Sequence, residues 1–514
     1  EGWKMVSKVR SMGLYGMDAF LVEIEADLST GLPSFDVVGL PDASVKESRD
    51  RIRASFKNTG FDFPVARITV NMAPADKRKE GSLYDLPLFV ALLIASGQLS
   101  APDPGFVFLG ELSLSGEVRP VRGVLPMVIK AREDGFQAVF VPAANAQEAA
   151  VVDGIRVYPV HSVKELFQHL TGAQSIAAAL PSEDKETPHA PLPDFSEVRG
   201  QEEAKRALEI AAAGGHNVML IGSPGTGKSM LAKRLPSILP DMSFEEMVET
   251  TKIHSIAGIL PPGASLVRTR PFRAPHHTVS SAGLSGGGTI PRPGELSLAH
   301  NGVLFLDELP EFGRAAMEVL RQPIEDGTVT ISRVNGSITY PCSVMLVAAM
   351  NPCPCGYFGH PTRVCTCSSK SVSRYLSRVS GPLLDRLDIH VEVPPVEFDK
   401  LASDEKAEPS SQIKKRVNAA RERQRERFAG TGITCNANIT PDLLTELCRL
   451  TPGAKELLRR AFDQLGLSAR AYDRVLKVAR SIADLDASPD ILPEHAAEAV
   501  QYRSLDRKYW TKEL

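Results

Sequence analysis

The sequence is short of cysteine, of signal-like apolar residues at its start and of long hydrophobic runs. Its 514 residues include 7 Cys, too few for a protein that depends on a disulfide framework. The longest apolar run, residues 86–96, is shorter than the roughly 20 apolar residues that a membrane-spanning helix needs. The first five residues contain no apolar signal region. These absences predict a soluble, cytoplasmic protein that does not enter a membrane.

Charge of one sign is not in excess either. The chain has 59 Lys and Arg against 62 Asp and Glu, so its formal net charge is −3. No global positive field indicates a nucleic-acid partner, although positive charge confined to one channel could still bind one. Hydrophobic residues make up 43% of the chain, which excludes a mostly disordered protein. The length predicts about three domains.

The pattern of the sequence divides it into four segments. Residues 1–172 alternate β-rich runs with helical stretches, and residues 173–195 form a linker rich in Ala, Ser, Glu and Pro. Residues 196–400 repeat an apolar strand, a Gly-rich turn and a helix, the pattern of a parallel α/β sheet. Residues 401–514 almost lack strand signals. In this last segment we expect amphipathic helices at 443–450, 454–465, 469–484 and 493–503.

The strongest motif is a phosphate-binding loop. Residues 222–229 match G-x-x-x-x-G-K-[ST] at every position, between an apolar strand and a helix. Backbone N–H groups and the helix N-terminus would bind phosphate, Lys228 would neutralise the β- and γ-phosphates, and Ser229 would bind Mg²⁺. We therefore predict an ATP site made of Gly222, Ser223, Pro224, Gly225, Thr226, Gly227, Lys228 and Ser229.

Polar residues at the ends of other strands complete the predicted catalytic set. Asp307 and Glu308 follow the apolar run 303–306; Asp307 would hold Mg²⁺ through water, and Glu308 would orient and deprotonate the attacking water. Asn351 follows the strand 345–350 and would contact the γ-phosphate or the water.

Two arginines are candidates for further contacts with the nucleotide. Arg386 is a candidate arginine finger that would act on a neighbouring subunit; the alternative is an ion pair with Asp385 or Asp388. Arg470 opens a helix and is a candidate second sensor, with Arg474 as its competitor.

Four of the seven cysteines gather in one short segment. Cys353, Cys355, Cys365 and Cys367 form two Cys-x-Cys pairs separated by nine residues. Four thiolates can make a closed, structural zinc site, which we predict here; His360 is a substitute ligand, and the alternative is four free thiols. Such a site would fix the loop that follows Asn351.

The order of these motifs resembles that of AAA+ ATPases. A β-hairpin at 328–340, with an Asn-Gly turn, resembles the hairpin that precedes sensor 1 in magnesium chelatase and MCM motors. The segments 270–278 and 293–302 are similar to the insert of magnesium chelatase-like ATPases. The resemblance implies an α/β fold: a P-loop AAA+ module at 196–400 with a helical, magnesium chelatase-like C-terminal lid at 401–514.

Over about residues 6–510 the chain resembles the ComM (YifB) competence-protein family, in segments such as 10–16, 38–42 and 351–357. This resemblance implies a homohexameric ring that uses ATP to move DNA, with branch migration during natural transformation as its role. Residues 1–172 resemble the α+β fold of Lon proteases. At the positions of the protease Ser and Lys, this sequence has Leu83 and Leu125, so we predict a non-catalytic domain. The alternative is a register shifted by one residue, which would place Ser82 at the nucleophile position.

Three regions are candidates for contact with single-stranded, forked or branched DNA, without base-specific readout. The first is the hairpin tip, with Arg333, Asn335 and Ser337. The second is the insert around Arg273, His276 and His277, for which a structural role is equally compatible and a metal site is not predicted. The third, the basic run 413–428, more often forms a solvated helix face with internal ion pairs, and we favour that interpretation.

Three functions are therefore compared. The favoured one is an ATP-driven hexameric DNA motor, a helicase or branch-migration translocase. The second is a protein-remodelling or metal-chelatase-type ATPase that does not act on DNA. The third is an ATP-dependent protease, against which the missing Ser–Lys pair argues.

Overall fold

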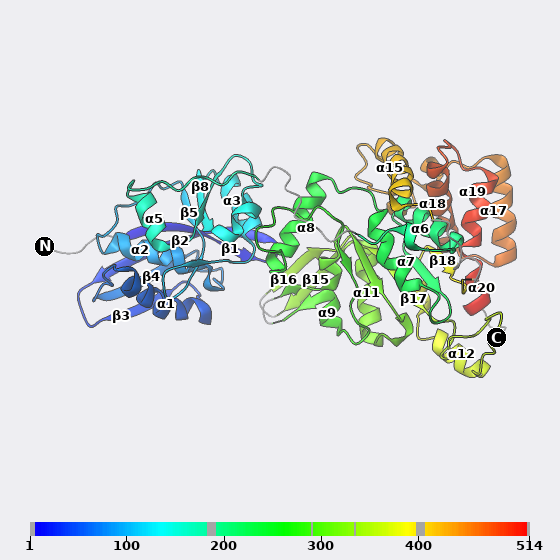
Figure 1. The fold of residues 1–514 in the computed structure, drawn as a ribbon, viewed down its shortest axis with the longest axis horizontal. Helices are drawn as coiled ribbons and strands as arrows, with labels where there is room; N and C mark the ends of the chain where they lie inside the picture. Colours follow the sequence, from blue (N-terminus) through cyan, green and yellow to red (C-terminus); the bar gives the residue numbers. More distant parts are fainter. Residues whose placement is uncertain (1–5, 182–191, 289–290, 334–335, 397–406, 511–514) are drawn as a thin grey trace. The chain divides into compact units, whose positions relative to one another are not determined.

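The computed structural model describes residues 6–181, 192–288, 291–333, 336–396 and 407–510 (Figure 1). The chain forms two compact units. Unit 1 comprises Glu1–Thr187, Phe244–Arg268 and Ser332–Thr339, and unit 2 comprises Pro188–Ser243, Thr269–Ile331 and Tyr340–Leu514. Two short segments from the middle of the sequence therefore belong to the unit that contains the N-terminal region.

Unit 1 is built on a seven-stranded mixed sheet in the order β3-β4-β2-β1-β5-β8-β9. The pairs β1–β2 and β2–β4 are antiparallel, and the other neighbours are parallel. The strands are β1 (Ser7–Tyr15), β2 (Asp18–Ser29), β3 (Ser34–Val38), β4 (Arg67–Ala73), β5 (Phe106–Phe108), β8 (Ala138–Pro142) and β9 (Arg156–Val160), with a small hairpin of β6 (Glu111–Leu112) and β7 (Val118–Arg119). The helices are α1 (Ala43–Thr59), α2 (Asp85–Ala95), α3 (Val124–Glu133), α4 (Ala146–Ala149), α5 (Val163–Leu170) and α8 (Phe244–Ala257).

The longest apolar run of the sequence is the core helix α2. All residues of α2 are buried, because the helix packs against the sheet and against α1. Its first residue, Asp85, is buried as well, and Nε of Arg51 donates to its carboxylate at 2.6 Å. A short apolar run of this kind therefore forms a domain core, and no helix of the described residues has the length and apolarity to cross a membrane.

The two leucines that we predict at the positions of the Lon protease Ser and Lys are part of this core. Leu125 is fully buried, and Leu83 is 9% exposed. Ser82, the hydroxyl beside Leu83, donates to the carboxylate of Glu111. Lys79 is buried and donates to the carbonyl of Pro74. A leucine pair offers neither nucleophile nor base, and a non-catalytic domain stays a prediction.

Unit 2 contains a five-stranded parallel sheet in the order β11-β14-β17-β10-β18, as the α/β pattern predicts. The strands are β10 (Val218–Ile221), β11 (Phe272–Arg273), β14 (Val303–Leu306), β17 (Met345–Met350) and β18 (Ile389–Glu392), with a small pair of β12 (Gly286–Gly287) and β13 (Arg292–Pro293). The helices before the lid are α6 (Glu202–Gly214), α7 (Lys228–Arg234), α9 (Ser281–Ser285), α10 (Glu295–Leu298), α11 (Arg314–Asp326), α12 (Ser369–Leu376) and α13 (Gly381–Leu384). Because the strands are parallel, their carboxyl ends lie at one edge.

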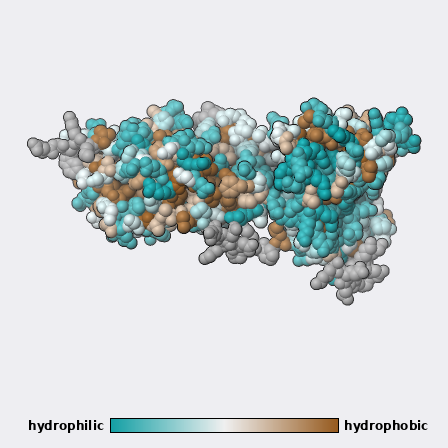
Figure 2. Space-filling model, turned by 90° about the horizontal axis from the view of Figure 1, so that it is seen from above, coloured by the Kyte–Doolittle hydropathy of each residue, from teal (hydrophilic) through white to brown (hydrophobic). Residues whose placement is uncertain are grey.

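The end of unit 2 is helical, as expected. The helices are α15 (Ser410–Arg427), α16 (Leu444–Leu447), α17 (Pro452–Leu465), α18 (Ala469–Leu485), α19 (Pro493–Gln501) and α20 (Leu505–Trp510). Helix α18 packs against α6, α15 and α19, and these helices share one core with the sheet (Figure 1). The face of the molecule in Figure 2 mixes hydrophilic and hydrophobic areas on both units. The apolar side chains of α18, such as Val475, Val478 and Ile482, are buried in the core that these helices share with the sheet.

The predicted hairpin is present as β15 (Thr328–Arg333) and β16 (Gly336–Pro341). Ile338 and Tyr340 of β16 are buried, whereas Ser337 and Thr339 are exposed. Asn335 lies outside the described residues, and the side chain of Arg333 is not among those described. Of the three residues predicted to contact DNA, Ser337 is therefore the one whose exposure the structure gives.

Candidate functional site

The phosphate loop lies between β10 and α7, as the motif predicts. Gly225 and Gly227 have φ angles of 80° and 93°, a left-handed conformation that glycine adopts without strain. Nζ of Lys228 donates to the carbonyls of Gly222 and Ser223 at 2.7 and 2.9 Å. Burial lowers the pKa of this ammonium group to about 8. No ion pair with Lys228 is found within the described ranges, so a phosphate group can take that place.

The neighbouring strands bring the other predicted residues to this loop. Asn351, which follows β17, accepts a hydrogen bond from Nζ of Lys228 at 3.2 Å. The hydroxyl of Ser229 donates to Oδ2 of Asp307, which follows β14, at 2.6 Å. A hydroxyl and a carboxylate side by side are oxygen ligands that suit Mg²⁺. The residues present therefore fit both a nucleotide phosphate and its magnesium ion.

Glu308 stands at the edge of this site in an unusual backbone conformation. Its φ and ψ are 54° and 47°, and its N–H donates to Oδ1 of Asp307 at 3.0 Å. Oε2 of Glu308 lies 3.3 Å from Nδ1 of His277. The sequence suggested His277 as a DNA contact and did not connect it with Glu308. The missed signal is that His277 lies shortly after β11, the strand that pairs with β14.

Neither of the two arginines predicted to act on nucleotide forms a described hydrogen bond with the phosphate loop. Arg386 donates to the carbonyl of Pro382 at 2.7 Å and forms an ion pair with Glu325 of α11. Its partner is thus neither of the two carboxylates that the sequence suggested. Arg470 is exposed at the start of α18 and has no hydrogen bond or ion pair with any described residue.

Arg474, the competitor of Arg470, is occupied by a buried carboxylate. It forms an ion pair with Asp388, which also lies 3.2 Å from Nδ1 of His216. Burial disfavours ionisation of Asp388, but the hydrogen bond from His216 and the charge of Arg474 outweigh it and hold the pKa of that carboxyl below its usual range. Arg474 therefore ties α18 to the residue before β18.

A residue that the sequence did not single out holds the phosphate loop from behind. Gln201 precedes α6, and its side-chain nitrogen donates to the carbonyls of Thr226 and Pro394 at 3.2 and 2.6 Å. No motif marks such a glutamine, because its partners are backbone atoms from distant parts of the chain.

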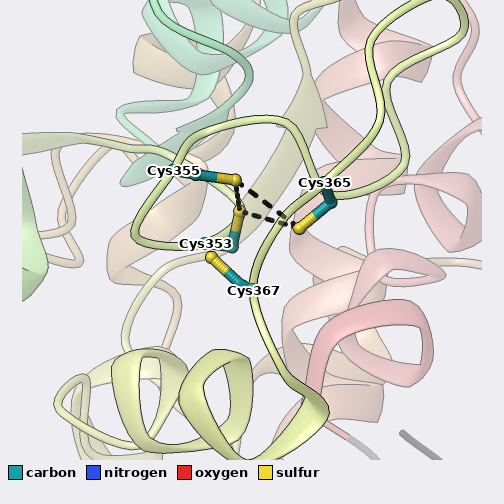
Figure 3. A group of neighbouring side chains, drawn as sticks. All are labelled: Cys353, Cys355, Cys365 and Cys367. Atoms are coloured by element: carbon teal, nitrogen blue, oxygen red, sulfur yellow. Dashed lines mark hydrogen bonds between the residues drawn. The ribbon is translucent and has the colours of Figure 1, made fainter.

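The four clustered cysteines converge on one point in the loop after β17 (Figure 3). All four sulfur atoms lie within 4.8 Å of one another, and three of the distances are 3.4, 3.5 and 3.7 Å. Tetrahedral zinc with Zn–S bonds of about 2.3 Å places its sulfurs about 3.8 Å apart. Among the described residues, His360 is not part of this group. Its Nδ1 accepts from the N–H groups of Thr362 and Arg363. The donor set therefore fits zinc.

The cysteine loop also touches the phosphate loop. Gly356 lies between the two Cys-x-Cys pairs and has a φ of 83°. A Cβ atom at this position would lie 2.4 Å from Cδ of Pro224. A cavity of about 260 Å³ beside this contact is lined by Gly222, Ser223, Pro352, Phe358–Pro361, Glu392–Pro395 and Tyr509. The loop after Asn351 thus lies against the phosphate loop.

The basic run is the helix α15. It has an exposed face, as favoured, but most of its ion pairs join it to other elements and are not internal. An intrahelical pair is present at Arg425 and Glu422, 2.5 Å apart. Other basic side chains instead contact neighbouring elements: Arg416 pairs with Glu209 of α6 and Arg427 with Asp484 of α18. These ion pairs stabilise the packing of α15 against α6 and α18, whose carboxylates Glu209 and Asp484 are buried.

Comparisons with known proteins cover most of the chain. The family model described as magnesium chelatase, subunit ChlI, matches residues 194–401, and the model for the ChlI C-terminal region matches residues 407–503. A third model, subunit ChlI of Mg-chelatase, matches residues 24–145. The Lon protease of Mycolicibacterium smegmatis is 28% identical over 169 residues, which are 30% of this chain and 21% of the protease.

Two relatives match almost the whole length. The competence protein ComM of Haemophilus influenzae is 43% identical over 505 residues, 97% of each chain. The protein YifB of Escherichia coli is 43% identical over 507 residues, 98% of each chain. These matches confirm the predicted architecture of a Lon-like N-terminal region, an AAA+ module and C-terminal helices. The chain belongs to the ComM (YifB) family of magnesium chelatase-like AAA+ proteins.

Proposed function

We propose that the protein is an ATP-driven motor that moves or separates DNA strands. The observation that carries this proposal is the convergence of Lys228, Ser229, Asp307 and Asn351 at the carboxyl ends of three parallel strands. The DNA part is supported by the hairpin of β15 and β16 and by the name of the relative ComM, a competence protein. Branch migration of recombination intermediates during natural transformation is the role that we assign to it.

The residues of the site divide the work of ATP hydrolysis. Lys228 and the loop N–H groups bind the phosphates, and Ser229 and Asp307 would hold Mg²⁺. The bound ion supplies charge neutralisation on the β- and γ-phosphates. Glu308 accepts the proton of the attacking water, and Asn351 keeps that water or the γ-phosphate in place. Because phosphoryl transfer depends on positioning and charge, these are the groups that one chain would contribute to the bond-breaking step.

A ring of identical subunits, with six as the proposed number, would complete the site. Arg386 would then reach the nucleotide of the next subunit after leaving Glu325, its partner in the single chain. Arg470 would contact the nucleotide of its own chain, since it is exposed and uncommitted among the described residues. The proposal thus assigns a role in trans to the first arginine and a role in cis to the second.

A labelled forked DNA or four-way junction, incubated with ATP and Mg²⁺, tests the motor. We expect strand separation by the parent chain and none by Lys228→Ala or Glu308→Gln, together with faster ATP turnover when DNA is added. Intact DNA, with ATP turnover that ignores DNA, would refute the motor and favour a protein-remodelling or chelatase-type ATPase.

We also propose that the four clustered cysteines bind one structural Zn²⁺ ion per chain. The fit of their sulfur atoms to a tetrahedral site supports this assignment. We expect one equivalent of zinc by mass spectrometry of the purified protein. Cys353→Ser should lose it, whereas Cys342→Ser should keep it, because Cys342 is buried outside the cluster with its thiol against the carbonyl of Pro323. Equal zinc contents of the two variants would refute the site.

A further inference from the structure

The hairpin of β15 and β16 lies against the end of strand β1. Its outer part, Ser332–Thr339, belongs to unit 1 together with β1 and β2. Ile338 of β16 is 7% exposed, and its Cγ2 would lie 2.5 Å from a Cβ atom at Gly16, in the turn between β1 and β2. We propose that this turn positions the hairpin for contact with DNA, with Gly16 and Ile338 as the positioning pair. The inference rests on the proposed DNA function.

The turn has the form that such a close approach needs. Tyr15 pairs with Asp18, so Gly16 and Met17 make a two-residue turn, of which one common type has glycine in the first position. Gly16 has a φ of 63°, which residues with a side chain rarely adopt. Because glycine has no Cβ, the branched side chain of Ile338 can lie directly against the backbone of the turn.

The end of β1 is also in contact with the loop that holds α8. A Cβ atom at Gly123 would lie 2.1 Å from Cδ1 of Leu14, in β1. The N–H of Gly123 donates to the carbonyl of Ser255, in α8, at 3.1 Å. The middle of the sequence contributes two segments to unit 1, one with α8 and one with the outer part of the hairpin. Both are therefore connected to the last residues of β1, which gives the turn a supported place in unit 1.

The contact of Ile338 with the turn decides which face of the hairpin is presented. Neighbouring side chains of a strand point to opposite faces. Ser337 and Thr339 flank Ile338 and are exposed, so they lie on the face away from the turn. The hydroxyl of Ser337 lies 3.2 Å from that of Ser332 on β15, so both strands contribute to this face. Hydroxyl groups can contact phosphate oxygens without reading bases, and a shift of Ile338 would move them.

The first test adds one methyl group to the turn and measures ATP turnover of the full-length protein with and without forked DNA. Carbon atoms prefer a separation of about 3.5–4.0 Å, so the methyl group of Gly16→Ala would shift Ile338 by about 1 Å. We expect the stimulation by DNA to fall about five-fold, with turnover in the absence of DNA unchanged. Gly135→Ala is the matched control. Gly135 has a φ of 81°, and a Cβ there would have no neighbour within 4 Å among the described residues.

A second substitution distinguishes positioning from a general loss of stability. Ile338→Ala removes both γ carbons and leaves its Cβ 3.5 Å from the carbon added at position 16, an ordinary contact. The double variant should therefore be stimulated by DNA more than Gly16→Ala and as much as Ile338→Ala alone, whereas two independent defects would add. Equal stimulation of Gly16→Ala and Gly135→Ala, or a double variant stimulated no more than Gly16→Ala, would overturn the inference.

A disulfide tests whether the hairpin stays on the turn while the protein works. The Cβ positions of residues 16 and 338 are 3.5 Å apart, within the range of about 3.5–4.5 Å found across disulfides. In Gly16→Cys/Ile338→Cys, oxidised glutathione should join the two sulfur atoms and leave as two molecules of reduced glutathione. The bond should change the mobility in a non-reducing gel, and the single variants should not show this change. We expect the bonded protein to keep the DNA stimulation of its reduced form. No bond, or a loss of stimulation that a reducing agent reverses, would overturn the inference.

The DNA proposal and this inference fail in different ways. A parent chain whose ATP turnover ignores DNA would refute the DNA motor and the positioning role together. A parent chain that is stimulated by DNA, with Gly16→Ala stimulated as strongly as its control, would overturn the positioning role alone.

Discussion

Replacing Arg474 by alanine should destabilise unit 2 without removing any group that binds nucleotide. Arg474 lies on α18 and pairs with Asp388, which is 5% exposed. Removing one member of a buried ion pair costs about 3–5 kcal/mol. Asp388 would still be contacted by His216 and by the N–H of Asn217, at 3.2 and 3.3 Å. We therefore expect a loss of about 2–3 kcal/mol from the free energy of unfolding.

The assay is unfolding by urea, followed by the fluorescence of Trp510. The chain has two Trp, so a Trp3→Phe background leaves Trp510 as the single fluorescent reporter. Trp510 lies on α20 in unit 2, with 6.1 Å between the centroids of its ring and that of His390. Arg470→Ala is the control, one helical turn earlier on α18. It should leave the unfolding midpoint unchanged and lower ATP turnover, if its proposed contact with nucleotide is correct.

The same pair gives a pH dependence with a defined sign. The pKa of Asp388 lies below its usual range in the folded chain, so its contribution to stability is present above about pH 4 and is lost as the pH falls further. Asp388→Asn should flatten this acid slope. Equal unfolding midpoints for Arg474→Ala and Arg470→Ala at neutral pH would refute the reasoning, because the two arginines would then be equally unimportant for the fold.

Three further results are expected. Gly356→Ala should weaken ATP binding, measured by titration with a fluorescent nucleotide, more than Gly359→Ala does. Both glycines have positive φ angles, but among the described residues only the methyl group added at Gly356 would meet a neighbour, Pro224. Equal losses of affinity would refute this. Gln201→Ala should raise KM for ATP more than it lowers kcat, because it removes the hydrogen bond that holds the carbonyl of Thr226 in the phosphate loop. Leu125→Lys should lower the free energy of unfolding by at least about 3 kcal/mol and produce no peptidase activity, whereas a stable, peptide-cleaving variant would contradict the core position of this residue.

The nucleotide site was predictable because its residues are fixed by local geometry. A phosphate loop needs its glycines and lysine at set spacings, and the polar residues after β14 and β17 meet it because parallel strands end at one edge. The cysteine cluster was predictable for the same reason, since two close pairs need only one turn of the loop to meet. In both cases each part of the site is a short segment, and parallel strands or one loop bring the parts together.

Long-range partners were not predictable. Arg386 pairs with Glu325 rather than with a carboxylate beside it in the sequence. Arg416 and Arg427 of α15 pair with carboxylates of α6 and α18 rather than with their own helix. His277 meets Glu308 because β11 and β14 are neighbours in the sheet. Such contacts depend on which elements pack together, and amphipathic periodicity does not encode that choice.

The division of the chain into two units has a consequence for how this protein can change by gene rearrangement. The chain passes from one unit to the other five times, after residues 187, 243, 268, 331 and 339. A cut after residue 187 would separate two segments of unit 1, Phe244–Arg268 with α8 and Ser332–Thr339 of the hairpin, from the rest of that unit. Fusion or exchange of domains at the linker would therefore yield two incomplete parts. We therefore expect the two units to occur together in one chain, and relatives that match over 97% or 98% of their length fit that expectation.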